Sequence, residues 1–180
     1  MAWTKGQLDT DSIEWLQAMP AGPVDPLPDS ADARDVACVH GAPRDEDQYI
    51  VSMRDAREQT ETMRTAKAEP RIVFFGHTHI QGGFAVNPEG EWFGVKPVYT
   101  EGDAAETYEL DLRAPTAYLI NPGSVGQPRD RDWRAAFALY DEAAQRVTFY
   151  RVPYDVRLAQ MRIQRAGLPD VLGSRLRVGR

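Results

Sequence analysis

The stretch RIVFFGHTHI, residues 71–80, predicts the fold. Its first half contains a continuous apolar run, which is typical of a β-strand buried on both faces, as in sheets covered by helices. The run stops at Gly76, and His77 and His79 follow within three residues. Side chains at the carboxyl ends of strands lie in the crevice where open α/β sheets bind ligands. The stretch therefore predicts an α/β fold with imidazoles at one edge of its sheet.

The third histidine of the chain stands in the same context. His40 ends a β-prone run over 35–40 and precedes Gly41, and the sequence holds no other histidine besides these three. Imidazole is a good ligand for Zn, Fe, Mn or Ni, and a neighbouring glycine lets the backbone pass close to a crowded centre. Histidines that only form hydrogen bonds are the common alternative, and the residues alone leave both interpretations open.

The remaining elements follow from apolar periodicity and from helix start and stop signals. Asp11 is the expected N-cap of the first helix and Pro20 its end, while Asp155 begins a later helix that Gly167 ends. We expect helices over 12–19, 45–68, 156–167 and 169–177, and strands over 35–40, 71–75, 116–120, 134–141 and 146–152.

Length and composition limit the class of protein. The 180 residues carry a net charge of -6 and a single cysteine, which excludes an internal disulfide. Apolar runs are far shorter than the ~20 residues that cross a bilayer, and no leader peptide is visible, so we expect a cytoplasmic protein without membrane contact. The acidic balance argues against a broad nucleic-acid surface. The locally basic segment 151–180 is interpreted as a solvated helix face.

Domain organisation is expected to be simple. We find no repeat or linker, and residues 1–180 are expected to form one domain. Residues 81–116 are rich in Gly, Asn, Pro and acidic side chains. This segment is a possible lid over a site, and an irregular surface excursion is the alternative.

Four segments in order along the chain resemble the calcineurin-like metallophosphoesterases, in particular their bacterial and archaeal phosphodiesterase branch. GHTH at 76–79 resembles the last metal-binding motif of that superfamily, and VHGAP at 39–43 resembles the histidine motif before it. NPGSVGQPRD at 121–130 resembles the strand and turn that follow, and residues 152–176 resemble the C-terminal helices. The resemblance covers nearly all of the chain.

The resemblance implies a phosphoesterase with two divalent metal ions, of the kind that hydrolyses phosphomonoesters or phosphodiesters. It implies that His40 and His77 ligate one metal and His79 the other, with Mn, Fe, Zn or Ni as the ions. A phosphoester is the implied substrate. The residues implied to shape the loops around the metals are Gly41, Gly76, Asn121, Gly123 and Ser124.

The chain also departs from the superfamily pattern. The Asp-x-His, Gly-Asp-x-x-Asp and Gly-Asn-His motifs that open such sites do not occur before His40. Roughly 60 residues, or two βα units, are therefore expected to be missing. Three neutral imidazoles cannot neutralise two dications, so we expect at most weak binding of one metal and assign no catalytic residue. Loss of the units is also expected to expose apolar edges near residues 71–75.

The expected fold is thus an α/β, partial metallophosphoesterase β-sandwich flanked by helices. Three functional hypotheses follow. In the first, the chain is part of an enzyme, and a complementing N-terminal segment supplies the other ligands. In the second, it is a non-catalytic binding or scaffold module of the same fold. In the third, exposed strand edges lead to self-association.

Overall fold

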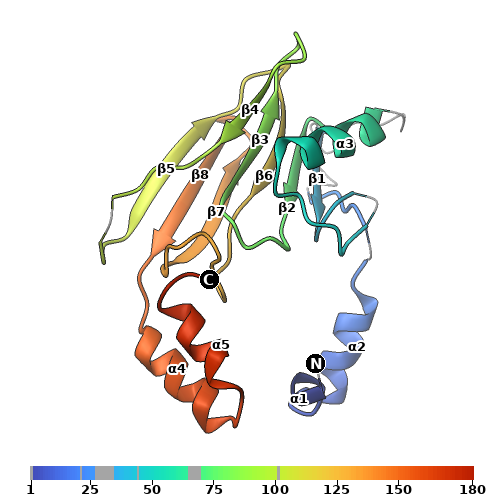
Figure 1. Cartoon of the computed structure of the whole chain (residues 1–180). Helices are drawn as coiled ribbons and strands as arrows, with labels where there is room; N and C mark the ends of the chain where they lie inside the picture. The colour runs from blue at the N-terminus through green and yellow to red at the C-terminus, as the bar shows by residue number, and fades with distance from the viewer. Residues whose placement is uncertain (1, 21, 27–34, 44, 65–69, 101) are drawn as a thin grey trace.

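The structure is a computed structural model that describes residues 2–20, 22–26, 35–43, 45–64, 70–100 and 102–180. Its strands form a five-stranded sheet in the order β1-β2-β6-β3-β4 and a three-stranded sheet in the order β5-β8-β7 (Figure 1). The strands are β1 (Val36–Val39), β2 (Ile72–Phe75), β3 (Gly82–Val86), β4 (Trp92–Val95), β5 (Glu106–Asp111), β6 (Ala117–Asn121), β7 (Ala135–Asp141) and β8 (Arg146–Val152).

The three parallel strands of the larger sheet determine where the site lies. β1 pairs with β2 and β2 with β6, both in parallel, whereas β3 and β4 run antiparallel. The carboxyl ends of parallel strands meet at one edge of a sheet. The residues that follow β1 and β2 therefore lie beside each other and beside the end of β6, at this edge of the sheet.

The core confirms that β2 is buried on both faces. Ile72 packs with Ile120 and Phe149 in the cluster between the two sheets. Val73 points the other way, into a cluster with Ala56, which belongs to the helix α3 (Met53–Arg64). Burying one such large side chain stabilises the fold by about 1.5–3 kcal/mol.

The expected exposure of residues 71–75 is wrong. β2 lies between β1 and β6, so β1 and not β2 is the outermost strand. Two backbone hydrogen bonds between Val24 and Cys38 cover part of the free edge of β1.

Two helices at the end of the chain confirm the prediction made from the sequence. α4 (Val156–Arg165) begins after Asp155, whose carboxylate accepts a hydrogen bond from Leu158 N at 2.9 Å. Gly167 follows it with a φ of 67°, the left-handed conformation that glycine allows. α5 (Asp170–Leu176) starts directly after Pro169.

Earlier helices differ from the prediction. α1 (Ala2–Lys5) was not expected, and α2 (Thr10–Ala18) is capped by Asp9 rather than Asp11. α3 starts at Met53 because Ser52 and Asp55 exchange two hydrogen bonds there, from Asp55 N to Ser52 Oγ and from Ser52 N to Asp55 Oδ2. Residues 45–52 form turns instead, and 65–68 of the expected helix lie outside the described residues.

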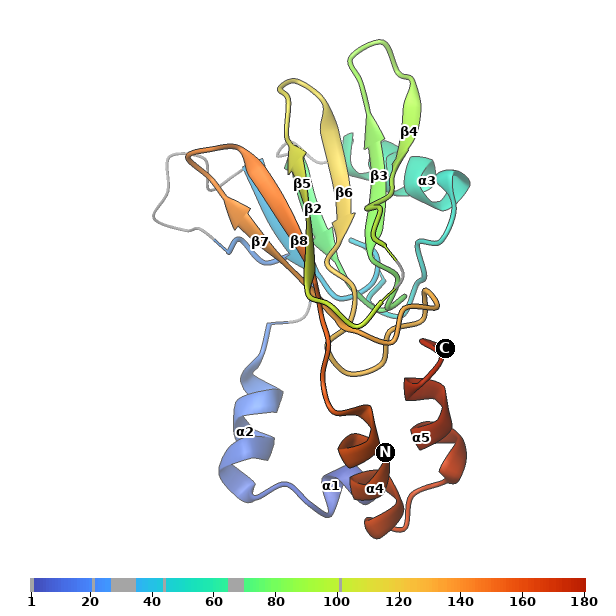
Figure 2. The ribbon, with the colours of Figure 1, turned by 90° about the vertical axis from the view of Figure 1, so that its left-hand side faces the viewer.

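The helices α1 and α2 form one pair, and α4 and α5 form another. Both helical pairs lie below the sheets in Figure 1, and the view turned by 90° shows the same arrangement (Figure 2). None of the residues in α2 is buried, and Trp15 is 65% exposed. Leu16 and Met19 add to this uncovered apolar surface. No described helix is long and apolar enough to span a membrane.

Residues 81–116 contain regular structure. They form the β3–β4 hairpin, whose turn is closed by Asn87 N donating to Glu91 O, and the strand β5 of the second sheet. The described residues 96–100 and 102–105 lie between the two parts in sequence.

Replacing Asp155 tests the cap of α4. Asp155→Ala removes the acceptor for Leu158 N, so we expect unfolding to become easier by about 1 kcal/mol, a fall in Tm of about 2–4 °C. Asp155→Asn keeps an acceptor oxygen and should unfold like the original protein in the same thermal melt. Equal melting of all three proteins would contradict the cap.

Candidate functional site

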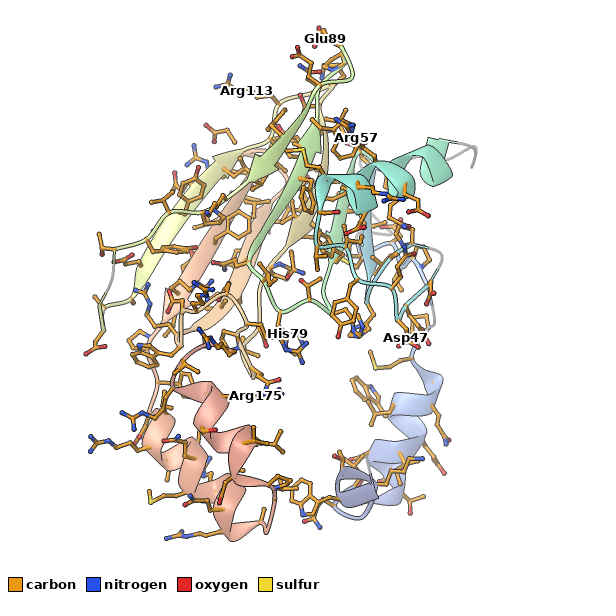
Figure 3. The ribbon with its side chains drawn as sticks, viewed as in Figure 1. Asp47, Arg57, His79, Glu89, Arg113 and Arg175 are labelled. Carbon is orange, nitrogen blue, oxygen red and sulfur yellow. The ribbon has the colours of Figure 1, made fainter. Side chains whose placement is uncertain are left out.

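All three histidines lie at the carboxyl edge of the larger sheet. His77 Nδ1 lies 3.0 Å from His40 Nε2, and their ring centroids are 4.8 Å apart. His79 is close enough for both rings to influence its pKa. Figure 3 shows His79 at the lower edge of the sheet, facing the region between the two helical pairs. His40 and His77, which are 37 residues apart in sequence, thus lie in contact, and His79 stands two residues after His77. These three residues are the histidine cluster.

The pairing of β1 with β2 places His40 beside His77. The register matches Val39 with Phe75, and Gly76 N donates to His40 O at 2.8 Å directly beyond the strands. Gly41 then passes close to the next turn, where a β-carbon would lie 2.4 Å from Glu46 O. Glycine is required there because any side chain would collide with the backbone.

Both histidines after β2 adopt an uncommon backbone conformation. His77 has a φ of 61° and His79 a φ of 60°. Left-handed conformations are rare outside glycine and persist where the surroundings hold them, often at functional sites. The turn is held in part by Thr78 N, which donates to Gly76 O at 2.6 Å.

Asn121, at the end of β6, anchors this turn. Its Nδ2 donates to Gly76 O at 2.9 Å and to Thr78 Oγ1 at 2.8 Å, while its Oδ1 accepts from Gly123 N at 2.9 Å. The side chain is 1% exposed. One buried amide therefore links β6 to the segment that carries the two histidines.

Gly123 and Ser124 shape the chain after β6. Gly123 has a φ of 90°, and a β-carbon there would lie 2.5 Å from that of Ala136. Ser124 Oγ accepts hydrogen bonds from Gly126 N at 3.2 Å and Gln127 N at 2.9 Å. Their contacts are with the loop itself rather than with the imidazoles.

The tautomer of His79 follows from its partner. Its Nδ1 lies 2.8 Å from Gln127 O, and a carbonyl oxygen only accepts hydrogen bonds. Nδ1 therefore carries the proton, and Nε2 of the neutral ring keeps its lone pair. Partial burial lowers the pKa of His79, against the effect of the Gln127 hydrogen bond, and the charge of Arg129 lowers it further. The neutral, ligand-competent ring is favoured.

Sequence analysis missed two contacts at the site. The ring of Tyr49 packs on His77 with a centroid separation of 4.1 Å, and the carbonyl of Gln127 orients His79. Neither has a local sequence signal, because one is a packing contact across loops and the other uses a backbone atom.

The cluster supplies nitrogen ligands but little negative charge. Within the parts of the chain that the structure describes, no group of three or more His, Cys, Asp or Glu side chains is arranged to hold a metal ion. The histidines alone offer neutral donors of the kind that Zn, Fe, Mn or Ni accept.

A cavity of about 640 Å³ opens next to this edge. Ile80, which follows His79 directly, lines it together with the 130–134 turn and parts of β3, β4 and the segments 96–100 and 102–103. The buried arginines Arg134 and Arg151 are also in its wall. None of the three histidines is among the residues that line this cavity.

Comparison with solved structures finds two proteins of similar fold, one of which is a metallophosphoesterase. The crystal structure of a metallophosphoesterase from Sphaerobacter thermophilus matches 99% of this chain and 65% of its own, with a TM-score of 0.79 and 32% identity. The hypothetical protein PH1004 from Pyrococcus horikoshii matches 97% of this chain and 57% of its own, with a TM-score of 0.67 and 20% identity, which shows the fold alone.

A sequence relative and the family search complete the comparison. The uncharacterized protein MJ0912 from Methanocaldococcus jannaschii is 38% identical over 109 residues, which are 61% of this chain and 40% of that protein. No protein-family model matches the chain. The chain thus resembles a metallophosphoesterase over nearly its whole length, yet spans less than two thirds of each of these relatives.

Removing the Asn121 side chain tests the anchor of the histidine turn. Asn121→Ala leaves Gly123 N and Gly76 O without their partners in a buried place, so we expect a loss of about 2–4 kcal/mol in the free energy of unfolding. Asn87→Ala is the control, since Asn87 bonds Glu91 in an exposed turn and should cost less than about 1 kcal/mol. Urea titration measures both, and equal losses would contradict the anchor.

Proposed function

We propose that the chain belongs to the calcineurin-like metallophosphoesterase superfamily and supplies the histidine half of a dinuclear site that hydrolyses phosphomonoesters or phosphodiesters. One observation carries the proposal: His40 and His77 are in contact at one sheet edge, with His79 two residues further on, in a chain that matches a metallophosphoesterase over 99% of its length. The bacterial and archaeal phosphodiesterase branch is the subgroup that its motifs resemble.

The spacing of two ring nitrogens supports a shared metal. Nitrogen ligands about 2.0–2.1 Å from one ion lie about 2.8–3.0 Å apart at octahedral angles and about 3.3–3.4 Å apart at tetrahedral angles. His40 Nε2 and His77 Nδ1 are 3.0 Å apart. The two rings therefore fit one divalent ion with little movement, once the proton between these two nitrogens has moved to the other nitrogen of its own ring.

His79 is the proposed ligand of a second ion. Its Nδ1–H is held by Gln127 O, so only Nε2 is available for a metal. Metal-bound histidines usually donate their other N–H to a carbonyl or carboxylate in this way. The chain's own contribution is thus to orient three neutral donors; bound divalent ions would polarise the phosphoester and lower the pKa of a water.

A complete site needs carboxylates from elsewhere. The chain spans 65% of the metallophosphoesterase that it resembles, and the acidic motifs of the superfamily do not precede His40. α2 exposes Trp15, Leu16 and Met19, an apolar surface that a further segment of the same fold would cover. We infer that activity requires such a complementing segment.

A non-catalytic binding module is the alternative. The histidine cluster argues against it, since a scaffold has no need for three imidazoles, two of them at positions with a left-handed backbone. Self-association through the edge of β1 is a further alternative to the complementing segment, and sedimentation distinguishes a monomer from an oligomer.

Metal titration tests the histidine cluster. We expect the chain to bind Zn²⁺ or Mn²⁺ weakly, at one ion per chain, in isothermal titration calorimetry. His77→Ala should weaken binding at least about tenfold, because it removes one of two paired ligands. Glu89→Gln is the control, since Glu89 lies at the upper end of the sheets and His79 at their lower edge (Figure 3). A folded chain without metal affinity would favour the scaffold.

A hybrid protein tests whether a complementing segment completes the site. The unmatched part of the Sphaerobacter thermophilus metallophosphoesterase is joined to this chain, and hydrolysis of bis(p-nitrophenyl) phosphate is followed with added Mn²⁺. We expect turnover in the hybrid but not in the chain alone, and loss of turnover with His79→Ala. A folded hybrid that binds metal yet hydrolyses no phosphoester would count against the enzyme proposal.

A further inference from the structure

We propose that the buried ion pair between Arg151 and Asp130 positions His79, acting through the turn over 127–130. The two partners lie 21 residues apart, on β8 and in the turn after β6. The proposal rests on the proposed function, since a fixed His79 ring matters for a metal ligand. Its contacts are independent of any metal.

The turn holds His79 at two points. Gln127 O accepts the ring Nδ1–H at 2.8 Å, and Arg129 N donates to His79 O at 3.0 Å. Backbone and side chain of one residue are thus bound by neighbours within a single turn. A shift of that turn would move both the left-handed backbone of His79 and its ring.

Asp130 fixes the turn in place. Its Oδ2 accepts hydrogen bonds from Gln81 N at 3.0 Å and from Arg151 Nη2. Gln81 is only two residues beyond His79, so the same carboxylate clamps the strand that leaves the histidine turn. Asp130 Oδ1 is buried without a hydrogen-bond partner among the described residues. The hydrogen bonds from Gln81 N and Arg151 Nη2 therefore hold this carboxylate in place.

Arg151 is a rigid support for this carboxylate. Its side chain is 4% exposed and belongs to the central strand of the smaller sheet. Its guanidinium also lies over the Tyr99 ring, 5.6 Å from the centroid, and 3.6 Å from Asp132 Oδ2. Removing one partner of a buried pair leaves the other charge uncompensated, so the turn would shift or take up water.

The position of the turn determines which of the two neutral tautomers His79 adopts. With Gln127 O in place, the proton stays on Nδ1 and Nε2 presents its lone pair to the cluster. If the turn moves away, nothing selects Nδ1–H, and the ring can carry its proton on Nε2 instead. The ion pair therefore controls the ligand that His79 offers, without touching the ring.

The test follows His79 by ¹⁵N–¹H correlation spectroscopy of the ring nitrogens in the full chain at neutral pH. We expect a single Nδ1–H tautomer in the original protein and a mixture in Arg151→Met and Asp130→Asn. Asp130→Asn keeps the volume and an acceptor for Gln81 N, so it carries the test if Arg151→Met does not fold.

Two further variants separate positioning from stability. Arg151→Lys keeps the charge and should preserve most of the Nδ1–H tautomer. Arg146→Met, on the same strand, breaks exposed pairs with Asp111 and Glu109 and should leave the His79 spectrum unchanged. A single Nδ1–H tautomer in folded Asp130→Asn would overturn the proposal, as would an equal change in Arg146→Met.

Zinc affinity distinguishes this proposal from the function on which it rests. The single zinc ion expected in this chain is held by His40 and His77, so Asp130→Asn should leave zinc affinity within about twofold while it changes the His79 tautomer. If the original chain binds no zinc while the tautomer still responds to Asp130→Asn, the metal site fails and the positioning stands. An unchanged tautomer in Asp130→Asn overturns the positioning and leaves the metal site intact.

Discussion

The parallel pairing of β1, β2 and β6 is the constraint on which the site depends. It brings the carboxyl ends of three strands to one edge, and each end delivers a polar residue there: His40, His77 and Asn121. The bond from Gly76 N to His40 O continues the pairing one step past the strands. A slip of β1 against β2 would separate the two rings that now lie 3.0 Å apart. The apolar packing of β2 on both faces opposes such a slip.

A second layer of polar contacts turns this edge into a defined site. Asn121 holds the start of the histidine turn and the 127–130 turn holds its end. Left-handed backbone at His77 and His79 costs about 1–3 kcal/mol per residue, so these buried hydrogen bonds offset a local strain. The Arg151–Asp130 pair extends the support to the smaller sheet. The site is therefore built by both sheets, although its imidazoles all follow strands of the larger one.

The sequence predicted what local patterns encode. The apolar run of β2, the antiparallel β7 and β8 and the cap of α4 at Asp155 follow from periodicity and turn chemistry. It failed where several residues satisfy the same rule: Asp9 and Asp11 both suit an N-cap, and the polar stretch before Met53 continues the helical period of α3. The contacts of Gln127 and of the Arg151–Asp130 pair could not be predicted from the sequence, because a backbone carbonyl and a contact across sheets leave no local pattern.

Under the proposed function, the charge of the cluster requires further ligands. Three imidazoles, one of them with a lowered pKa, offer neutral donors, and two divalent ions held by neutral donors alone would repel each other at the separation of about 3.5–4 Å typical of two-metal sites. Carboxylates remove that repulsion, and the described residues place none in a metal-binding group. The helix α2, which exposes Trp15 and Leu16, lies below the sheets in Figure 1. One additional segment of the fold, packed on α2 and reaching the histidines, would satisfy both the uncovered surface and the missing charge.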